Sequence, residues 1–358
     1  MMEAKKINPV FDDLNNPETI LSHVEQLQKD LETEQENKGL FKVKTANQWI
    51  EQAKTSPIPL MLFGALWHDS ELCILFADTN LGKSILAVQI ADSISKGKTI
   101  AGFTLEAEKQ TVLYFDFELS AKQFEIRYSI KNEAKKVFEQ HYSFDTNFKR
   151  LEINPDAEIP ENRSFEDYLN QSLEQSITET GAKILIIDNL TYLKNETEKA
   201  KDALPLMKHL KALKSKYGLS ILALAHTPKR DLSKPLTRND LQGSKMLINF
   251  VDSCFAIGES HTDKHLRYLK QIKARNTEII FDTENVAVCQ IQKPFNFLEF
   301  EFVGTGTERE HLKEFTEKDR ESIIEKAKEL SQKGYSQRQI SAELNISLGA
   351  VNKYLKTQ

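Results

Sequence analysis

Long apolar runs alternate with helix-like segments between residues 71 and 302, and this alternation predicts an α/β domain. Several runs are uninterrupted stretches of β-branched and aromatic residues, which is typical of strands buried on both faces of a parallel sheet. Strands are expected within residues 72–78, 111–118, 182–190, 219–226, 252–259, 265–274 and 286–291. The core is therefore expected to hold a mainly parallel central sheet covered by helices.

An amphipathic helix is expected over residues 16–39, ahead of this core. Asn16 and Pro17 form a helix start, one apolar stripe follows, and Gly39 ends the pattern. Residues 1–40 contain four Lys and nine Asp or Glu, so they account for the whole net charge of −5. This acidic arm packs either on its own domain or on a neighbouring subunit. After it, Thr45 and Gln48 predict the capping box of a short helix.

The last 40 residues predict a separate unit of three short helices. One apolar face runs through residues 317–332, and Gly334 ends that helix. Ser336 and Gln339 predict a capping box at the start of the second helix, and a turn at 345–347 leads to the third. This pattern resembles a helix-turn-helix of the resolvase and sigma-factor type, although small three-helix units also mediate protein contacts.

Residues 77–84 form a phosphate-binding motif between an apolar strand and an apolar-periodic helix. It consists of Ala77, Asp78, Thr79, Asn80, Leu81, Gly82, Lys83 and Ser84. Backbone N–H groups of such a loop cradle phosphates, Lys83 is expected to reach the β- and γ-phosphates, and the Ser84 hydroxyl is expected on Mg²⁺. Ala77 stands where the motif usually has its first Gly, which bears on how tightly nucleotide binds. The sequence therefore predicts ATP and Mg²⁺ as ligands.

A carboxylate ends the apolar strand that precedes residue 189. Asp188 follows Lys83 by about 105 residues, behind an intervening strand and helix, and is expected to hold the Mg²⁺ shell. An apolar strand that ends in Asp is also common at plain turns and helix starts.

The order of these elements resembles that of the RecA-like ATPases, and among them that of the DnaB-type and plasmid RepA-type hexameric helicases. The resemblance covers roughly residues 45–300: a phosphate loop, a strand followed by Glu118 and an Arg-containing helix, a strand ending in Asp188, and a strand ending in His226. It implies an α/β RecA-like P-loop NTPase core.

The resemblance also implies roles for single residues. It makes Glu118 the residue that polarises the attacking water, places Arg127 in the cofactor site, and makes His226 a sensor of the γ-phosphate. Asp116 is the rival of Glu118, because residues two apart on a strand share a face. The structural alternative for Glu118 is a place in the N-cap region of the next helix.

The segment Lys273-Ala-Arg275-Asn276 matches a basic element of the family. There it inserts its basic pair into the nucleotide site of the adjacent subunit, so Lys273 and Arg275 are expected to act in trans. The resemblance thus implies self-association into a ring, with a hexamer as the expected form. Taken alone, such a basic run is usually a solvated strand end.

Two loops and the last helix are the candidates for contact with DNA. In RecA-like motors the loops after the corresponding strands grip the phosphate backbone of a single strand. Flexible polar loops without a partner are the alternative for each. The candidate residues are Lys194, Lys229, Arg230, Arg238, Lys245, Asn352, Lys353 and Lys356.

Composition adds limits. The chain is 40% hydrophobic and 28% charged, which is ordinary for a globular protein, and it has neither an apolar run long enough for a membrane span nor a signal-peptide pattern. Cys73, Cys254 and Cys289 are far apart and lie in strand-like runs, so they are expected as buried thiols in a reducing cytoplasm. A nucleic-acid surface must be a local basic patch, because no excess of positive charge exists overall.

These observations predict an acidic helical arm over residues 1–44, an ATPase domain over 45–305 and a DNA-binding helix-turn-helix over 316–358. The expected function is an ATP-hydrolysing, helicase-like motor on DNA, which acts in replication or mobilisation of a plasmid or other mobile element. The alternative is an ATP-dependent DNA-binding switch or repressor with little hydrolysis.

Overall fold

The computed structural model describes residues 41–190, 192, 203–228, 230–241, 244–314, 317–344, 346 and 348–356. The chain divides into two compact units, 1–58 and 59–358. The helix expected over residues 16–39 lies outside the described residues. The first unit includes α2 (Ala46–Ala53), which begins at the expected capping box of Thr45 and Gln48 and has no buried residue.

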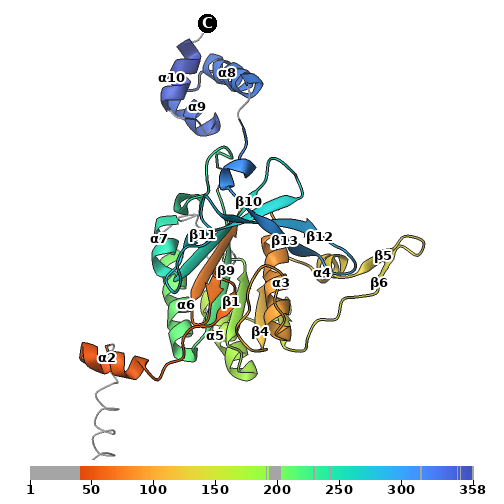
Figure 1. Ribbon diagram of the computed structural model, residues 1–358, viewed down its shortest axis with the longest axis vertical. Coiled ribbons are helices and arrows are strands. Elements are labelled where there is room, and N and C mark those ends of the chain that lie inside the picture. Colours follow the sequence, from red (N-terminus) through yellow and green to blue (C-terminus); the bar gives the residue numbers. More distant parts are fainter. Residues whose placement is uncertain are drawn as a thin grey trace, which may run out of the picture. The chain divides into compact units, whose positions relative to one another are not determined.

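A central sheet organises the second unit (Figure 1). Among the described residues it has nine strands in the order β13-β12-β11-β10-β3-β9-β8-β4-β7. From β10 to β7 all neighbours are parallel, whereas β11, β12 and β13 extend the sheet antiparallel beyond β10. The strands are β3 (Leu72–Ala77), β4 (Val112–Asp116), β7 (Phe148–Leu151), β8 (Ile184–Asp188), β9 (Ser220–His226), β10 (Ser253–Glu259), β11 (Leu266–Lys273), β12 (Val286–Gln292) and β13 (Glu299–Gly306).

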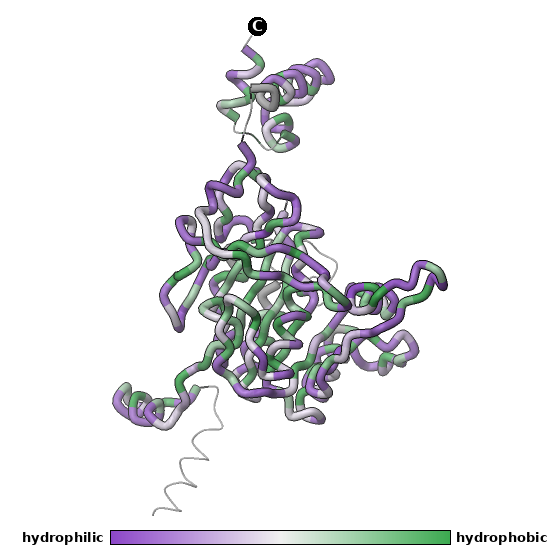
Figure 2. The backbone as a smooth tube through the Cα atoms, turned by 45° about the vertical axis from the view of Figure 1, so that its right-hand side comes forward, coloured by the Kyte–Doolittle hydropathy of each residue, from purple (hydrophilic) through white to green (hydrophobic). Residues whose placement is uncertain are grey.

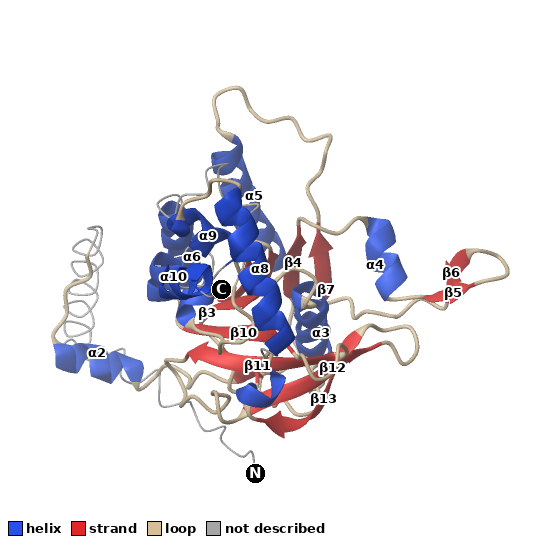
Figure 3. Cartoon of the chain, turned by 90° about the horizontal axis from the view of Figure 1, so that it is seen from above, coloured by secondary structure: helices blue, strands red, loops and turns tan. Residues whose placement is uncertain are grey.

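Helices cover both faces of the sheet (Figure 3). Side chains of β3 alternate between the faces, because Ile74 and Phe76 belong to one apolar cluster, and Cys73 and Leu75 belong to the other. The first cluster includes side chains of α5 (Phe165–Thr180), α6 (Ala203–Tyr217) and α7 (Ser244–Phe250), and the second includes those of α3 (Lys83–Lys96). Burial on both faces explains why the central strands are continuous apolar runs, seen as green stretches in Figure 2.

Short elements surround this core. Two hairpins are formed by β1 (Met61–Phe63) with β2 (Trp67–His68) and by β5 (Ile130–Asn132) with β6 (Val137–Glu139). Around the core the structure also has the helix α4 (Ala121–Arg127) and the 3₁₀ turns η4 (Arg238–Asp240) and η5 (Glu308–His311). None of the helices that the structure describes is long and apolar enough to cross a membrane.

The three C-terminal helices have an apolar cluster of their own. They are α8 (Glu317–Gln332), α9 (Gln337–Leu344) and α10 (Leu348–Lys356). Ala327, Ile340 and Val351 are buried at their centre, one from each helix. The backbone N–H and hydroxyl of Ser336 donate to Gln339 Oε1, at 2.9 and 2.8 Å, so the expected capping box is present.

The α/β fold with a mainly parallel sheet is confirmed. Each expected strand is present within its predicted range or one residue beyond it, and the three cysteines are buried and free. The sequence pattern missed β7 and β13, the two outermost strands. Both are partly exposed and carry charged residues, so neither forms an apolar run.

Candidate functional site

The phosphate loop joins β3 to α3 at the carboxyl end of the parallel strands. Asn80 (φ 65°) and Gly82 (φ 95°) adopt left-handed backbone conformations, and Gly82 is the N-cap of α3. A Cβ at Gly82 would lie 2.9 Å from the Phe300 ring and 3.0 Å from Ile291 Cδ1. Gly82 is therefore required both by its conformation and by the close approach of β12 and β13.

Lys83 points back across the loop and is buried. Its ammonium donates to the carbonyl oxygens of Ala77 and Asp78, at 3.0 and 3.1 Å, and lies 3.3 Å from His226 Nδ1. Burial lowers the pKa of Lys83, and the largest opposing influence is the charge of Asp188. The cation is held by carbonyl dipoles that a phosphate group could replace.

Ser84 and Asp188 meet beside the loop. The Ser84 side chain is close enough to the Asp188 carboxylate to oppose the rise in its pKa, and Tyr114 Oη donates to Asp188 Oδ2 at 2.6 Å. Burial raises the pKa of Asp188 to about 6. A hydroxyl next to a desolvated carboxylate offers the hard oxygen ligands that Mg²⁺ prefers, so these two residues fit the metal role that the sequence predicts for them.

Glu118 lies next to His226 and Asn189. Its Oε1 is 3.4 Å from His226 Nε2 and accepts a hydrogen bond from the Asn189 amide, whose nitrogen is also 3.1 Å from His226 Nε2. The hydrogen bond to His226 is the main cause that lowers the pKa of Glu118. The structure thus brings together three side chains at or just beyond the ends of three adjacent strands, β4, β8 and β9. Asn189 is one that the sequence pattern did not single out.

Asp116, the rival of Glu118, has a different environment. Its side chain is fully buried, forms an ion pair with Arg150 Nε at 2.9 Å, and accepts from the backbone N–H groups of Glu118 and Leu119. The strand ends at Asp116, so alternation along a strand no longer relates the two carboxylates. Ser120 caps α4, which leaves Glu118 outside the cap. Asp116 fixes the turn on which Glu118 is carried.

Arg127 is the last residue of α4. Its Nη1 is buried and has no hydrogen-bond partner among the described residues. Lys293, in the connection from β12 to β13, donates to the carbonyls of Ile126 (2.7 Å) and Ser129 (2.5 Å) on either side of it. The end of α4 is therefore tied to the same strand pair that covers Gly82.

Lys273 and Arg275 lie at the opposite end of the sheet. Lys273 pairs with Cys254 at the start of β10, whereas the phosphate loop follows Ala77, which pairs with Ile257 near the other end of that strand. Lys273 Nζ donates to the carbonyls of Ile248 and Val251, at 2.6 and 2.7 Å. Arg275 Nη1 donates to Asp252 at 3.0 Å, and its side chain is 48% exposed. The structure does not bring this pair to the phosphate loop of its own chain.

The DNA candidates are only partly described. Lys194 and Lys229 lie outside the described residues, and Lys245 is in α7, with nothing described of its side chain. Arg230 donates to the Lys234 carbonyl at 3.0 Å, and Arg238 begins η4 and is exposed. Asn352, Lys353 and Lys356 lie on α10 and are exposed.

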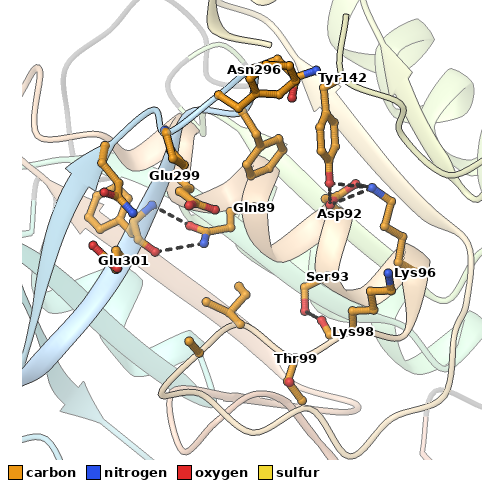
Figure 4. A pocket seen from close by; sticks show the side chains of 17 residues that line it. Gln89, Asp92, Ser93, Lys96, Lys98, Thr99, Tyr142, Asn296, Glu299 and Glu301 are labelled. Carbon is orange, nitrogen blue, oxygen red and sulfur yellow. Dashed lines mark hydrogen bonds and ion pairs between the residues drawn. The ribbon is translucent and has the colours of Figure 1, made fainter. Parts of the chain in front are cut away.

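A cavity of about 410 Å³ lies beside the second half of α3, away from the phosphate loop (Figure 4). Asp92 on its wall accepts from Tyr142 at 2.7 Å and pairs with Lys96 at 2.9 Å. Gln89 clamps the Phe300 backbone with hydrogen bonds of 3.0 and 2.9 Å. Because the Phe300 ring packs at Gly82, the wall of this cavity also supports the phosphate loop.

Comparison with known proteins gives a family match and a distant structural likeness. No curated protein matches the chain. Among solved structures, a KaiC-like protein from the hyperthermophilic archaeon Pyrococcus horikoshii OT3 is similar, with 12% identity and a TM-score of 0.44 over 65% of this chain and 90% of that one. Residues 40–231, more than half of the chain, match the family AAA_25, an AAA domain. The chain that carries this phosphate loop and its facing carboxylates therefore belongs to the AAA_25 family of AAA domains.

Proposed function

We propose that this P-loop ATPase is a DNA-associated motor of the helicase type that hydrolyses ATP between the subunits of a ring, with a hexamer as the expected form. Its expected setting is replication or mobilisation of a plasmid or other mobile element. The observation that carries the proposal is the division of the candidate catalytic groups between the two ends of the sheet. Lys83, Glu118 and His226 surround the phosphate loop, whereas Arg275 is exposed at the far end.

The division supports hydrolysis across a subunit boundary. Arg275 cannot reach the phosphate loop of its own chain, because the length of the parallel strands separates them. A guanidinium beside the γ-phosphate is worth about 10³-fold or more in related phosphoryl transfers. A second subunit that offers its Arg275 to this loop would complete the site.

In the proposed reaction Lys83 exchanges its carbonyl contacts for the β- and γ-phosphates, and Glu118 orients the attacking water. Ser84 and Asp188 would hold Mg²⁺, which when bound neutralises charge on the phosphates. His226 contacts both Lys83 and Glu118, so it can relate phosphate binding to the position of the carboxylate.

One observation favours the second candidate, a DNA-bound nucleotide switch with little hydrolysis. The C-terminal helices close their own apolar cluster and leave Asn352, Lys353 and Lys356 exposed on α10, as expected for a duplex-binding helix. The ATPase rate with and without single-stranded DNA separates the two functions. A motor is stimulated by the single strand, whereas a switch keeps the same low rate.

A further inference from the structure

The two oxygens of the Asp252 carboxylate have different partners. Oδ2 accepts from the Leu72 N–H at 3.0 Å and from the Lys214 ammonium at 2.9 Å, whereas Oδ1 accepts from Arg275 Nη1 at 3.0 Å. Leu72 begins β3 and Lys214 lies on α6, so Oδ2 joins two elements of the core to the start of β10. One oxygen therefore stabilises the fold, and the other is directed to the arginine.

The chain is held on both sides of Arg275. Lys273 donates to two carbonyls near the end of α7, at 2.6 and 2.7 Å, and the Asn276 amide donates to Glu71 Oε1 at 3.0 Å. Glu71 is itself buried, with 1% exposed. Because the backbone is fixed before and after Arg275, the direction of the guanidinium depends on the contact of its own side chain, which is the one with Asp252.

The contact with Asp252 leaves Arg275 able to bind an anion. Burial raises the pKa of Asp252, but the hydrogen bonds from the Leu72 N–H and Lys214 outweigh it, so the pKa is lowered and the carboxylate is charged at neutral pH. Lys214 and Arg275 share this single negative charge, so a positive charge remains in excess. The contact with Asp252 uses Nη1, and the other N–H donors of the half-exposed guanidinium can still meet a phosphate.

We propose that Asp252 is a positioning residue, which holds the Arg275 guanidinium in the orientation that a γ-phosphate bound by an adjacent subunit requires. The inference rests on the proposed function, since it takes Arg275 as acting in trans. Fixing a long, unrestrained side chain costs conformational entropy, and Asp252 provides this order before the subunits meet ATP. Asp252 acts through Arg275 and does not touch the nucleotide.

Asp252→Asn separates the roles of the two oxygens. With its amide oxygen in place of Oδ2, the new side chain still accepts from Leu72 and Lys214, and its NH₂ group then faces Arg275 without an acceptor to offer. Steady-state phosphate release by the full chain gives kcat and KM for ATP. We expect kcat to fall about 10²-fold, as it does for small misplacements of a reacting group, and KM to stay unchanged because the phosphate loop is intact.

Asp145→Asn is the matched control. Asp145 Oδ1 accepts from the Asn147 N–H at 2.9 Å, and Oδ2 pairs with Lys109 at 2.7 Å. The control variant can thus keep a backbone contact and lose a contact with a cation, as Asp252→Asn does. Asp145 precedes β7 at one edge of the sheet, whereas Arg275 follows β11 near the other, so the control is expected to keep the wild-type kcat.

A double variant tests whether Asp252 acts through Arg275. The protein with both Asp252→Asn and Arg275→Ala is expected to hydrolyse ATP at the rate of Arg275→Ala alone, because a positioning residue has no effect once its target is absent. Mixing provides a second measurement. Asp252→Asn mixed with Lys83→Ala should regain activity, since the latter offers an intact Arg275 to an intact phosphate loop, whereas Asp252→Asn mixed with Arg275→Ala should regain none.

The outcomes separate this inference from the proposed function. If Asp252→Asn melts below the control, Asp252→Ser, whose hydroxyl can accept from the Leu72 N–H, replaces it with the same expectations. If Arg275→Ala is inactive while the Asp252 variant keeps the wild-type kcat, the positioning role is overturned and the function stands. A further loss of rate in the double variant, equal to the loss in the wild-type background, would make Asp252 structural only and would also overturn the inference. If Arg275→Ala keeps the wild-type rate, the action of Arg275 in trans is wrong and the inference falls with it.

Discussion

The two ends of the parallel strands use similar side chains in different ways. At the amino end the charged groups bind both backbone and one another: Asp252 accepts from the Leu72 N–H at 3.0 Å and pairs with Lys214 at 2.9 Å and Arg275 at 3.0 Å, and Lys273 donates to two carbonyls near the end of α7. At the carboxyl end the contacts join side chains that flank the phosphate loop, as between Lys83 and His226 or Asn189 and Glu118. The contacts at the amino end stabilise the fold and leave Arg275 partly exposed, whereas the contacts at the carboxyl end can be exchanged when a ligand binds.

The largest effect is expected from removal of the one cation within the loop motif. Lys83→Ala should abolish ATP binding or turnover, because the β- and γ-phosphate charge then loses the ammonium that the loop supplies. Equilibrium binding of a fluorescent ATP analogue and a phosphate-release assay measure the two effects. Nucleotide affinity and turnover equal to the wild type would remove the phosphate-loop assignment.

The amino end is tested by complementation between two inactive proteins. Arg275→Ala alone should lower the ATPase rate about 10³-fold or more, as loss of such a guanidinium does in related systems. Mixing it with Lys83→Ala should restore part of the activity, because some interfaces then pair an intact phosphate loop with an intact Arg275. The mixture should run as an oligomer when ATP is present.

Arg309→Ala, an exposed arginine on η5, is the matched control and should keep the full rate without mixing. A monomer whose rate per molecule is independent of concentration, together with no rescue on mixing, would rule out the ring and favour the switch.

The carboxyl end is tested by comparing its two carboxylates. Glu118→Gln should keep ATP bound and lower hydrolysis about 10²- to 10⁴-fold, the usual contribution of a group that activates water. Asp116→Asn should instead destabilise the fold, by about 3–5 kcal/mol, since it leaves Arg150 without its buried partner. Single-turnover hydrolysis and thermal melts distinguish the two. If Asp116→Asn melts like the wild type and holds ATP unhydrolysed, the roles are reversed.

How far the sequence predicts this site depends on where the partners lie. β3, β8 and β9 were predictable because burial on both faces makes them apolar runs, and the loop motif is contiguous. The role of Asp116 was not predictable from the sequence, because it depends on Arg150. Arg150 lies on the edge strand β7, which is not an apolar run.

Asn189 shows the same limit. It has no local signature, because its significance comes from Glu118 and His226, which are 71 and 37 residues away in the sequence. Contacts between strand ends depend on the order of the strands in the sheet, and no single segment of the sequence predicts that order.

A smaller effect is expected on the free energy of unfolding, which the buried charge of Asp188 lowers at neutral pH. Burial raises the pKa of Asp188 from 3.8 to about 6, so the folded chain keeps this proton at a pH where the unfolded chain has lost it. The protonated group favours the fold fully below about pH 4, and this contribution is lost as the pH rises through 6. Asp188→Asn should therefore raise the free energy of unfolding at pH 7.5, by on the order of 3 kcal/mol, and have little effect at pH 4.

Denaturant unfolding without Mg²⁺ or nucleotide, at the two pH values, measures this difference. Glu133→Gln, whose side chain is 77% exposed, serves as the control and should change neither value. A gain from Asp188→Asn that is equal at both pH values would mean that the burial of charge is not its cause.

The smallest effect on ATP turnover is expected from truncation after Phe315. Ala327, Ile340 and Val351 form the centre of an apolar cluster whose members all come from residues 327–355, so removing residues 316–358 takes away whole helices and no part of the two core clusters. Basal ATPase activity should therefore stay within about twofold of the full chain, as is usual for changes that leave a packed core untouched. Binding to a duplex site should be lost, because Asn352, Lys353 and Lys356 are removed with α10. Fluorescence anisotropy with a labelled duplex, alongside phosphate release, measures both.

Two outcomes would contradict this prediction. A truncated protein that still binds its duplex site would make the C-terminal helices a protein-interaction module and would assign the duplex contact to the core. A truncated protein without ATPase activity would show that the two regions are not separable.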